Sequence, residues 1–163
     1  MMLGFLLAFV LLVPLQAAPA VEPEEPAPRP WVGPGRFCGY ASVIDLQPGE
    51  QIIAGEGGVH GASYIWSGPF GAIVVDEINW ASRPKHVVRS ISKEGGIEIF
   101  QLRGGGSKPL YVVSDGGHLV AYLSSSMFRK NKSDLKYIRR IGLSDHAGDK
   151  GTGCKYRMLF SWE

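Results

Sequence analysis

Side chains that could bind a ligand concentrate in a glycine-rich segment, residues 55–71, in which six glycines alternate with aromatic and polar residues. Glycine lets a backbone approach a ligand closely, and aromatic rings supply flat contact area. The segment therefore predicts a recognition pocket, whose candidate binding residues are Glu56, His60, Tyr64, Trp66 and Phe70. The competing interpretation is that the glycines serve turns and the aromatic side chains belong to the core.

A second candidate is a basic run, residues 129–140, which carries six Lys and Arg residues against a single acid, Asp134. Basic side chains with aromatic rings among them can bind anionic partners by charge and stacking. The candidate binding residues here are Arg129, Lys130 and Lys132. The expected partner is a protein or an envelope polymer, and the sequence carries no strong nucleic-acid signal. The competing interpretation is a solvated edge strand whose charges discourage edge-to-edge association.

Two smaller polar groups are weaker candidates. Asp145, His146 and Asp149 lie within five residues of a predicted loop and could bind a cation or exchange protons. A cluster of this kind is usually solvated surface. Asp76 and Glu77 are neighbours on a predicted strand, where adjacent side chains point to opposite faces. They are therefore not expected to form a catalytic dyad.

The sequence lacks the motifs of several well-marked enzyme classes. It contains no Gly-x-Ser-x-Gly, no His-Glu-x-x-His, no phosphate-binding loop and no Cys-x-x-Cys. These absences disfavour the corresponding hydrolases, metalloproteases and nucleotide-binding proteins, and we predict no metal and no cofactor. Asn131 begins a glycosylation sequon, which has meaning only in a eukaryotic source.

The first twenty residues predict export. They carry no charge, are apolar over residues 3–15 and end in the small-x-small sequence Ala-Pro-Ala. This pattern is typical of a cleaved signal peptide, residues 1–20, and predicts a secreted or periplasmic protein. The competing interpretation is an uncleaved membrane anchor, which Pro14 disfavours. The lack of Lys or Arg before the apolar stretch departs from the usual signal.

The remaining chain divides into a spacer and a single domain. Residues 21–35 are rich in Pro and Glu and predict an extended spacer, and residues 36–163 predict one β-rich domain. The chain has only two cysteines, Cys38 and Cys154, near the two ends of this domain. In an exported protein we expect them to form a disulfide that ties the first strand to the last.

The domain is organised around residues 110–123, in which two apolar runs flank an Asp-Gly-Gly sequence at 115–117. This is a β-hairpin signature, because Gly and Asp readily adopt the positive φ of tight turns. The same acid-Gly-Gly pattern recurs at 94–96 and 56–58. The last two hairpins in sequence order predict a four-stranded meander.

A two-residue turn in the 110–123 hairpin would place alternate residues on one face, namely Leu110, Val112, Leu119, Ala121 and Leu123. Both faces of the hairpin are apolar. Such a strand pair is expected in the centre of a sandwich or in the wall of a barrel, because a solvated face would be polar at alternate positions.

Further strands are predicted at 36–46, 51–55, 72–80 and 154–162. Residues 133–143 are ambiguous: their alternation favours a strand, whereas Ser133 and Gly142 resemble helix start and stop signals. We favour the strand, because its neighbours are strands. The predicted fold is an all-β, antiparallel sandwich or barrel of roughly eight to ten short strands with consecutive hairpins and one disulfide.

These features favour an exported, non-catalytic β-domain that binds a macromolecule or a cell-envelope component through its loops. The alternative is a small exported hydrolase whose His and acid residues come together from separate loops. A third possibility is a structural envelope protein that keeps its N-terminal anchor. The net charge of +2 is too small to imply a partner.

Overall fold

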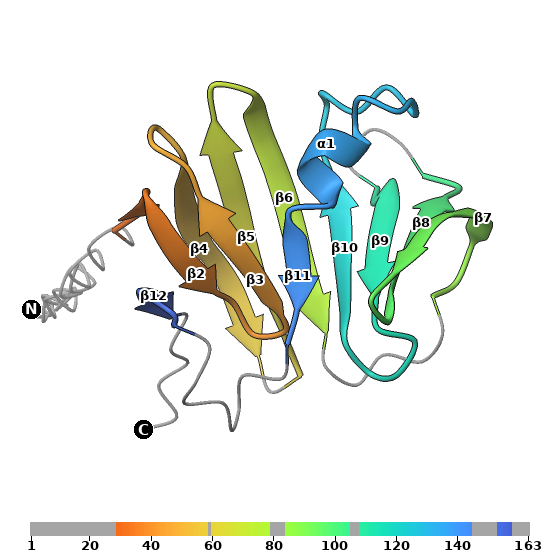
Figure 1. Ribbon diagram of the computed structural model, residues 1–163, viewed down its shortest axis with the longest axis horizontal. Helices are drawn as coiled ribbons and strands as arrows, with labels where there is room; N and C mark the ends of the chain where they lie inside the picture. Colours follow the sequence, from red (N-terminus) through yellow and green to blue (C-terminus); the bar gives the residue numbers. More distant parts are fainter. Residues whose placement is uncertain (1–28, 59, 79–83, 105–107, 145–152, 158–163) are drawn as a thin grey trace, which may run out of the picture.

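The computed structural model describes residues 29–58, 60–78, 84–104, 108–144 and 153–157, which form two stacked β-sheets and one short helix (Figure 1). The larger sheet has eight strands in the order β1 (Trp31–Val32), β4 (Gln51–Gly58), β5 (Gly61–Gly68), β6 (Gly71–Ile78), β10 (Val120–Ser124), β9 (Tyr111–Ser114), β8 (Ile97–Leu102) and β7 (Val87–Glu94). The smaller sheet has four, in the order β11 (Ile141–Leu143), β3 (Ser42–Leu46), β2 (Gly35–Cys38) and β12 (Tyr156–Arg157). The helix α1 spans Leu135–Ile138.

The all-β prediction is confirmed. Among the described residues there are twelve strands, two of which have only two residues, and every pair except the parallel β2–β12 pair is antiparallel. The small sheet lies across β4, β5 and β6 (Figure 1). Phe37 of β2 contacts Tyr64 of β5 with ring centroids 5.1 Å apart, so the two sheets pack face to face. The architecture is therefore a sandwich of two unequal sheets.

The core between the sheets follows from alternation along the strands. In β3, β5 and β6 every second side chain is buried, as expected where one face of a strand is covered. Ile44 from the small sheet and Trp66 and Val75 from the large sheet are completely buried in one cluster. Ile138 of α1 completes this cluster at the end that the small sheet leaves open.

All three predicted hairpins are present, as β4–β5, β7–β8 and β9–β10. The predicted meander is also confirmed, because β7, β8, β9 and β10 are consecutive neighbours in the large sheet. Gly95 and Gly96 have φ values of 58° and 82°, and Gly116 has 75°. These positions lie in the left-handed region, which favours glycine and explains the glycines of the β7–β8 and β9–β10 turns. The copy at 56–58 lies at the end of β4 instead, and neither Gly57 nor Gly58 has a positive φ.

The predicted two-residue turn of the β9–β10 hairpin is wrong. The loop has five residues, 115–119, and Val113 pairs with Ala121. The Asp115 carboxylate accepts hydrogen bonds from the backbone N–H groups of Gly117, at 2.8 Å, and Leu119, at 3.1 Å. This side chain stabilises a wider loop than the Gly-Gly pair alone would require.

The wider loop changes which residues share a face, because side chains alternate along a strand. Tyr111, Val113, Ala121 and Leu123 belong to the core between the sheets. Val112 lies on the opposite face, in a smaller apolar cluster with Leu102 and Val120. The prediction that both faces are apolar is nevertheless confirmed.

The strand prediction for residues 133–143 is wrong in its first half. This segment forms the helical turn α1 and then β11, which pairs with β3. A helical turn places Leu135 and Ile138, three residues apart, against the core. Gly142, which resembled a helix stop, lies inside β11. Residues 36–46 are likewise not one strand, because a turn in which the Gly39 N–H bonds to the Ser42 carbonyl separates β2 from β3.

The predicted disulfide is confirmed: Cys38 of β2 is bonded to Cys154, just before β12. The large sheet begins before the predicted domain boundary, because Trp31 pairs with Ile52 and its ring lies 5.3 Å from that of Phe37. The predicted signal peptide lies outside the described residues. Within the described ranges, no helix is long and apolar enough to cross a membrane.

Candidate functional site

The candidate site is an open groove of about 680 Å³ between the edge strand β7 and the helix α1. Three of its lining residues come from β7 and four from α1 and the residues on either side of it: Arg89, Ser90, Ile91, Lys132, Leu135, Lys136 and Arg139. Four of these seven side chains are cationic. Ile91 and Leu135 are partly buried against the core and provide an apolar floor.

Two β-bulges in β7 determine which of its side chains face this groove. The register with β8 shifts between Val87 and Arg89 and again between Ser90 and Ser92. A bulge re-aims the side chains that follow it. Arg89 therefore lies opposite Gln101, and its Nε donates to Gln101 Oε1 at 2.9 Å. This contact holds the guanidinium at the mouth of the groove.

Asp134 positions the other wall. Its carboxylate is buried and accepts hydrogen bonds from the backbone N–H groups of Arg129 and Lys130 and from the Tyr111 hydroxyl, the last at 2.7 Å. Lys130 has a φ of 60° in this turn. The turn and α1 are thus fixed to β9, while the exposed side chains of Lys132, Lys136 and Arg139 remain at spacings of four and three residues.

The positive charge of the groove is not neutralised within the described part of the chain. Elsewhere Arg36 pairs with Asp45, Lys93 with Glu98 and Arg140 with Glu50. The four cations of the groove form no such ion pair among the described residues, and no carboxylate lines it. Like charges held together repel one another unless an anion binds between them. The groove is therefore electrostatically suited to an anionic ligand.

Only part of the predicted basic site lies in this groove. Lys132 lines it, whereas Arg129 and Lys130 are exposed but are not among its lining residues. The Arg129 guanidinium instead donates to the Ser126 carbonyl at 2.7 Å. Sequence reasoning missed Arg89, because only the tertiary fold brings β7 beside α1. An Arg in an apolar alternating strand is a weak signal by itself.

Arg140, the last residue of the basic run, has a structural role. Its guanidinium donates to both oxygens of Glu50, at 2.7 and 2.8 Å, and lies 4.8 Å from the centroid of the Trp66 ring. Burial by itself raises the pKa of Glu50. The hydrogen bonds and charge of Arg140, with the N–H groups of Gln47 and Trp66, outweigh that effect and leave the pKa below its ordinary value.

Replacing Arg140 should therefore destabilise the protein in a pH-dependent way. Arg140→Gln is expected to lower the free energy of unfolding by about 2–3 kcal/mol at pH 7, since it leaves the Glu50 carboxylate buried without its cation. A carboxyl group whose pKa is lower in the folded than in the unfolded protein stabilises the fold at pH values above its unfolded-state pKa. This contribution is lost as the pH falls through the folded-state pKa. The difference between the two proteins in urea titrations should consequently shrink between pH 7 and pH 3.

The matched control is Arg36→Gln, which breaks the solvent-exposed pair with Asp45 at a similar distance of 2.7 Å. Exposed pairs contribute little. The control should therefore have a much smaller effect. Equal losses for the two variants, or a loss for Arg140→Gln that does not change with pH, would contradict the assignment.

Most of the glycine-rich segment is strand rather than loop. It forms the end of β4, all of β5 and the turn into β6. Tyr64 and Trp66 are completely buried in the core, and Phe70 is half-buried, with its ring centroid 5.1 Å from that of Trp66 and 4.8 Å from that of Tyr137. The two predicted candidate segments thus meet, but through packed aromatic rings.

The other candidates of this segment do not complete a site. His60 is exposed in the turn between β4 and β5, and the side chain of Glu56 lies outside the described residues. Neither the basic groove nor the second cleft described below is lined by any of the five candidates of this segment.

Asp76 and Glu77 point to opposite faces of β6, as expected, and Glu77 is buried between the sheets. Its carboxyl group accepts hydrogen bonds from the backbone N–H groups of Tyr40 and Ala41 and from the Ser42 hydroxyl. Burial raises the pKa of Glu77. The Ser42 hydroxyl also lies 2.5 Å from that of Tyr64. This buried cluster ties the β2–β3 turn to the large sheet.

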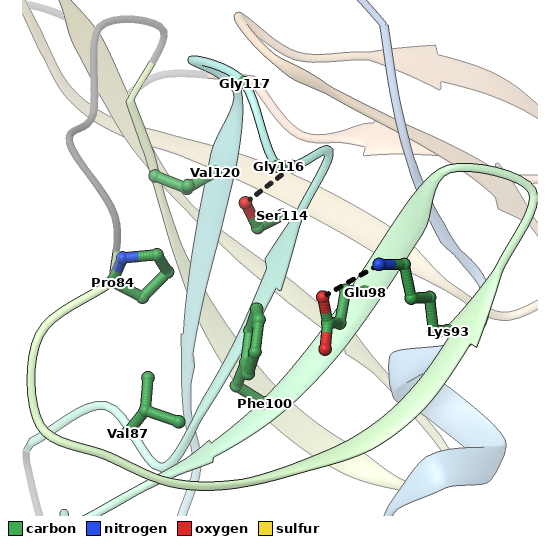
Figure 2. Close-up of a pocket in the computed structure, with 9 residues that line it drawn as sticks. All are labelled: Pro84, Val87, Lys93, Glu98, Phe100, Ser114, Gly116, Gly117 and Val120. Carbon is green, nitrogen blue, oxygen red and sulfur yellow. Dashed lines mark hydrogen bonds and ion pairs between the residues drawn. The ribbon is translucent and has the colours of Figure 1, made fainter.

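A second cleft, of about 810 Å³, lies on the opposite face of the large sheet (Figure 2). Figure 2 shows Pro84, Val87 and Phe100 along its apolar side and the Lys93–Glu98 ion pair at one end. Both signs of charge are present there. This cleft consequently shows no preference for an anion or a cation, unlike the basic groove.

The described histidines contribute to neither cleft. His60, His86 and His118 are exposed, and none of them lines the groove or the cleft of Figure 2. Asp145, His146 and Asp149 lie outside the described residues. Within the described ranges, no group of three or more His, Cys, Asp or Glu residues is arranged to hold a metal ion.

No protein family model, no curated protein and no solved structure matches this chain. Its function is therefore inferred from the arrangement of its own residues.

Proposed function

We propose that this protein is an exported, non-catalytic β-domain that binds an anionic envelope polymer in the groove between β7 and α1. The observation that carries the proposal is that Arg89, Lys132, Lys136 and Arg139 converge on one groove, which has no carboxylate among its described lining residues. An exported location is supported by the signal-like N-terminal sequence and by the Cys38–Cys154 disulfide.

The groove has the physical features that bind a polyanion. Clustered cations raise the local concentration of an anionic chain, and each neutralised charge releases a counterion into solution. The apolar side chains of Ile91 and Leu135 at its floor can contact the uncharged part of each repeating unit. Such a site should bind polyanions of different repeating units, with an affinity that depends strongly on salt concentration and without chemically changing the polymer.

Removing two of the groove charges should weaken binding measurably. For Lys132→Gln with Lys136→Gln, we expect affinity for immobilised dextran sulfate at 50 mM salt to fall about five- to thirtyfold, as two exposed ion pairs are lost. The dependence of affinity on salt should also become shallower. Retention on the column and titration calorimetry measure both effects, with neutral dextran as the background.

The matched control is Lys85→Gln with Lys108→Gln, which removes the same total charge from exposed positions outside the groove. This control should retain most of the affinity. Equal losses in both double variants would show that net charge, rather than the groove, governs binding. An unchanged affinity in the Lys132 and Lys136 variant would eliminate the groove as the site.

A further inference from the structure

We infer that, in the absence of a polymer, the basic groove is occupied by the acidic segment 21–28 of a second copy of this chain. The inference shares the groove with the proposed function but does not require that any polymer bind there. It assigns an occupant that the sequence itself supplies and a head-to-tail mode of self-association.

Charge complementarity supports this occupant. Residues 21–28 read VEPEEPAP and contain three acids, Glu22, Glu24 and Glu25, without a basic residue. The groove presents four cations, and no carboxylate is among its described lining residues. The same chain therefore supplies both a run of acids without a basic residue and a groove whose described lining is cationic.

The periodicity of the segment also fits the groove. Three prolines in eight residues favour a polyproline II conformation, which has three residues per turn. Glu22 and Glu25 would then share one face, while Pro23 and Pro26 share another. The acidic face complements the Lys and Arg side chains, and the proline face complements the apolar floor.

The topology of the large sheet favours a second copy over the same chain. The segment enters the fold at β1, which is one edge of the eight-stranded sheet, and the groove borders β7 at the other edge (Figure 1). Seven strand spacings of about 4.8 Å separate these edges by roughly 34 Å. From Trp31 back to Glu22, the most distant of the three glutamates, nine residues in polyproline II reach only about 28 Å. The glutamates therefore reach a neighbouring molecule more readily than their own groove.

An association of this kind is heterologous, because the segment of one copy meets the groove of the next. It should weaken with salt and compete with polyanions for the same cations. The experiment uses exported protein whose mass confirms that residues 21–28 are present. Its self-association is followed by sedimentation equilibrium at 20 and 300 mM salt.

Two variants make the test specific. The segment variant carries Glu22→Gln, Glu24→Gln and Glu25→Gln with a native groove, and the groove variant carries Lys132→Gln and Lys136→Gln with a native segment. We expect the native protein to associate at low salt and each variant alone to associate at least tenfold more weakly. Mixed together, the two variants should form a 1:1 complex, because the groove variant supplies the native acidic segment and the segment variant supplies the native groove.

Other outcomes would overturn the inference. They are a native protein that is monomeric at both salt concentrations, variants that associate as well as the native protein, or a mixture that forms no complex. Retention on dextran sulfate is measured in parallel on the segment variant. Loss of self-association with polymer binding retained would support both proposals, whereas polymer binding without any native self-association would leave only the proposed function.

Discussion

Glu77→Ala is expected to lower the free energy of unfolding by about 3–5 kcal/mol, which would be among the largest effects of any single substitution in this protein. The substitution removes the acceptor that the Glu77 carboxyl group provides to the half-buried Tyr40 N–H and the buried Ala41 N–H, and it removes one of the partners of the Ser42 hydroxyl. It also opens a cavity between the two sheets. Urea unfolding followed by tryptophan fluorescence measures the change.

Glu77→Gln separates hydrogen bonding from charge. The amide oxygen can still accept from the backbone, so we expect a smaller loss of about 1 kcal/mol at low pH. Burial raises the pKa of Glu77 in the folded protein. A carboxyl group whose pKa is higher in the folded than in the unfolded protein contributes stability that is fully present below its unfolded-state pKa. This contribution is lost as the pH rises through its folded-state pKa. The free energy of unfolding of the native protein should therefore fall relative to that of the Gln variant over this rise in pH, because the other carboxyl groups titrate in both proteins.

Asp76→Ala is the matched control, because Asp76 is the neighbouring acid on the opposite face of β6 and is only partly buried. It should change stability little. A Glu77→Gln variant with the same pH dependence as the native protein would contradict the assignment of that titration to Glu77. A loss for Asp76→Ala as large as that for Glu77→Ala would contradict the structural role of the buried cluster.

Removal of the disulfide should have a comparably large effect. Cys38 and Cys154 are separated by 116 residues, and closing a loop of that length stabilises the folded state by about 5 kcal/mol through the lower entropy of the unfolded chain. We expect Cys38→Ala with Cys154→Ala to lose most of this amount. The parallel pairing of β12 with β2 adjoins this bond, so it should be the first pairing to open.

Hydrogen exchange and urea titration of the double variant test this expectation. The native protein treated with a reductant provides the control, because it removes the same bond without changing the core volume at Cys38, which is buried. Agreement between the two would assign the loss to the crosslink. A stability unchanged in both would mean that the strands of the small sheet hold the ends of the fold without it.

The elements that stabilise the fold are largely separate from the basic groove. Glu77, Ser42 and Tyr64 lie between the sheets, and the disulfide lies in the small sheet. The groove borders β7, an edge strand of the large sheet, and the side chains of Lys132 and Lys136 in it are exposed. Charge changes in the groove should therefore alter binding without lowering stability, which keeps the binding experiments interpretable.

The sequence alone was sufficient to predict the features that depend on local chemistry. The acid-Gly-Gly pattern identified the β7–β8 and β9–β10 hairpins because their turns contain glycines with positive φ, a local requirement that few residues meet. The copy at 56–58 lies beside the third hairpin but inside β4. Apolar alternation identified the strands, and the presence of two cysteines in a chain with a signal-like N-terminal sequence predicted the disulfide. The opposite orientation of Asp76 and Glu77 followed from strand geometry alone.

Tertiary structure decided the features that depend on which segments meet. The register of β9 and β10 depended on the hydrogen bonds of the Asp115 side chain. The helix α1 formed because a helical turn lets Leu135 and Ile138 pack against the core. Tyr64 and Trp66 were candidate ligand contacts in the sequence and became core when the small sheet covered β5. Arg89 joined Lys132 only because the meander and its bulges carry β7 beside α1. Turn and strand preferences depend on residues that are neighbours in the sequence. Burial and charge clustering depend on contacts between residues that are distant in the sequence, and the local sequence pattern does not specify those contacts.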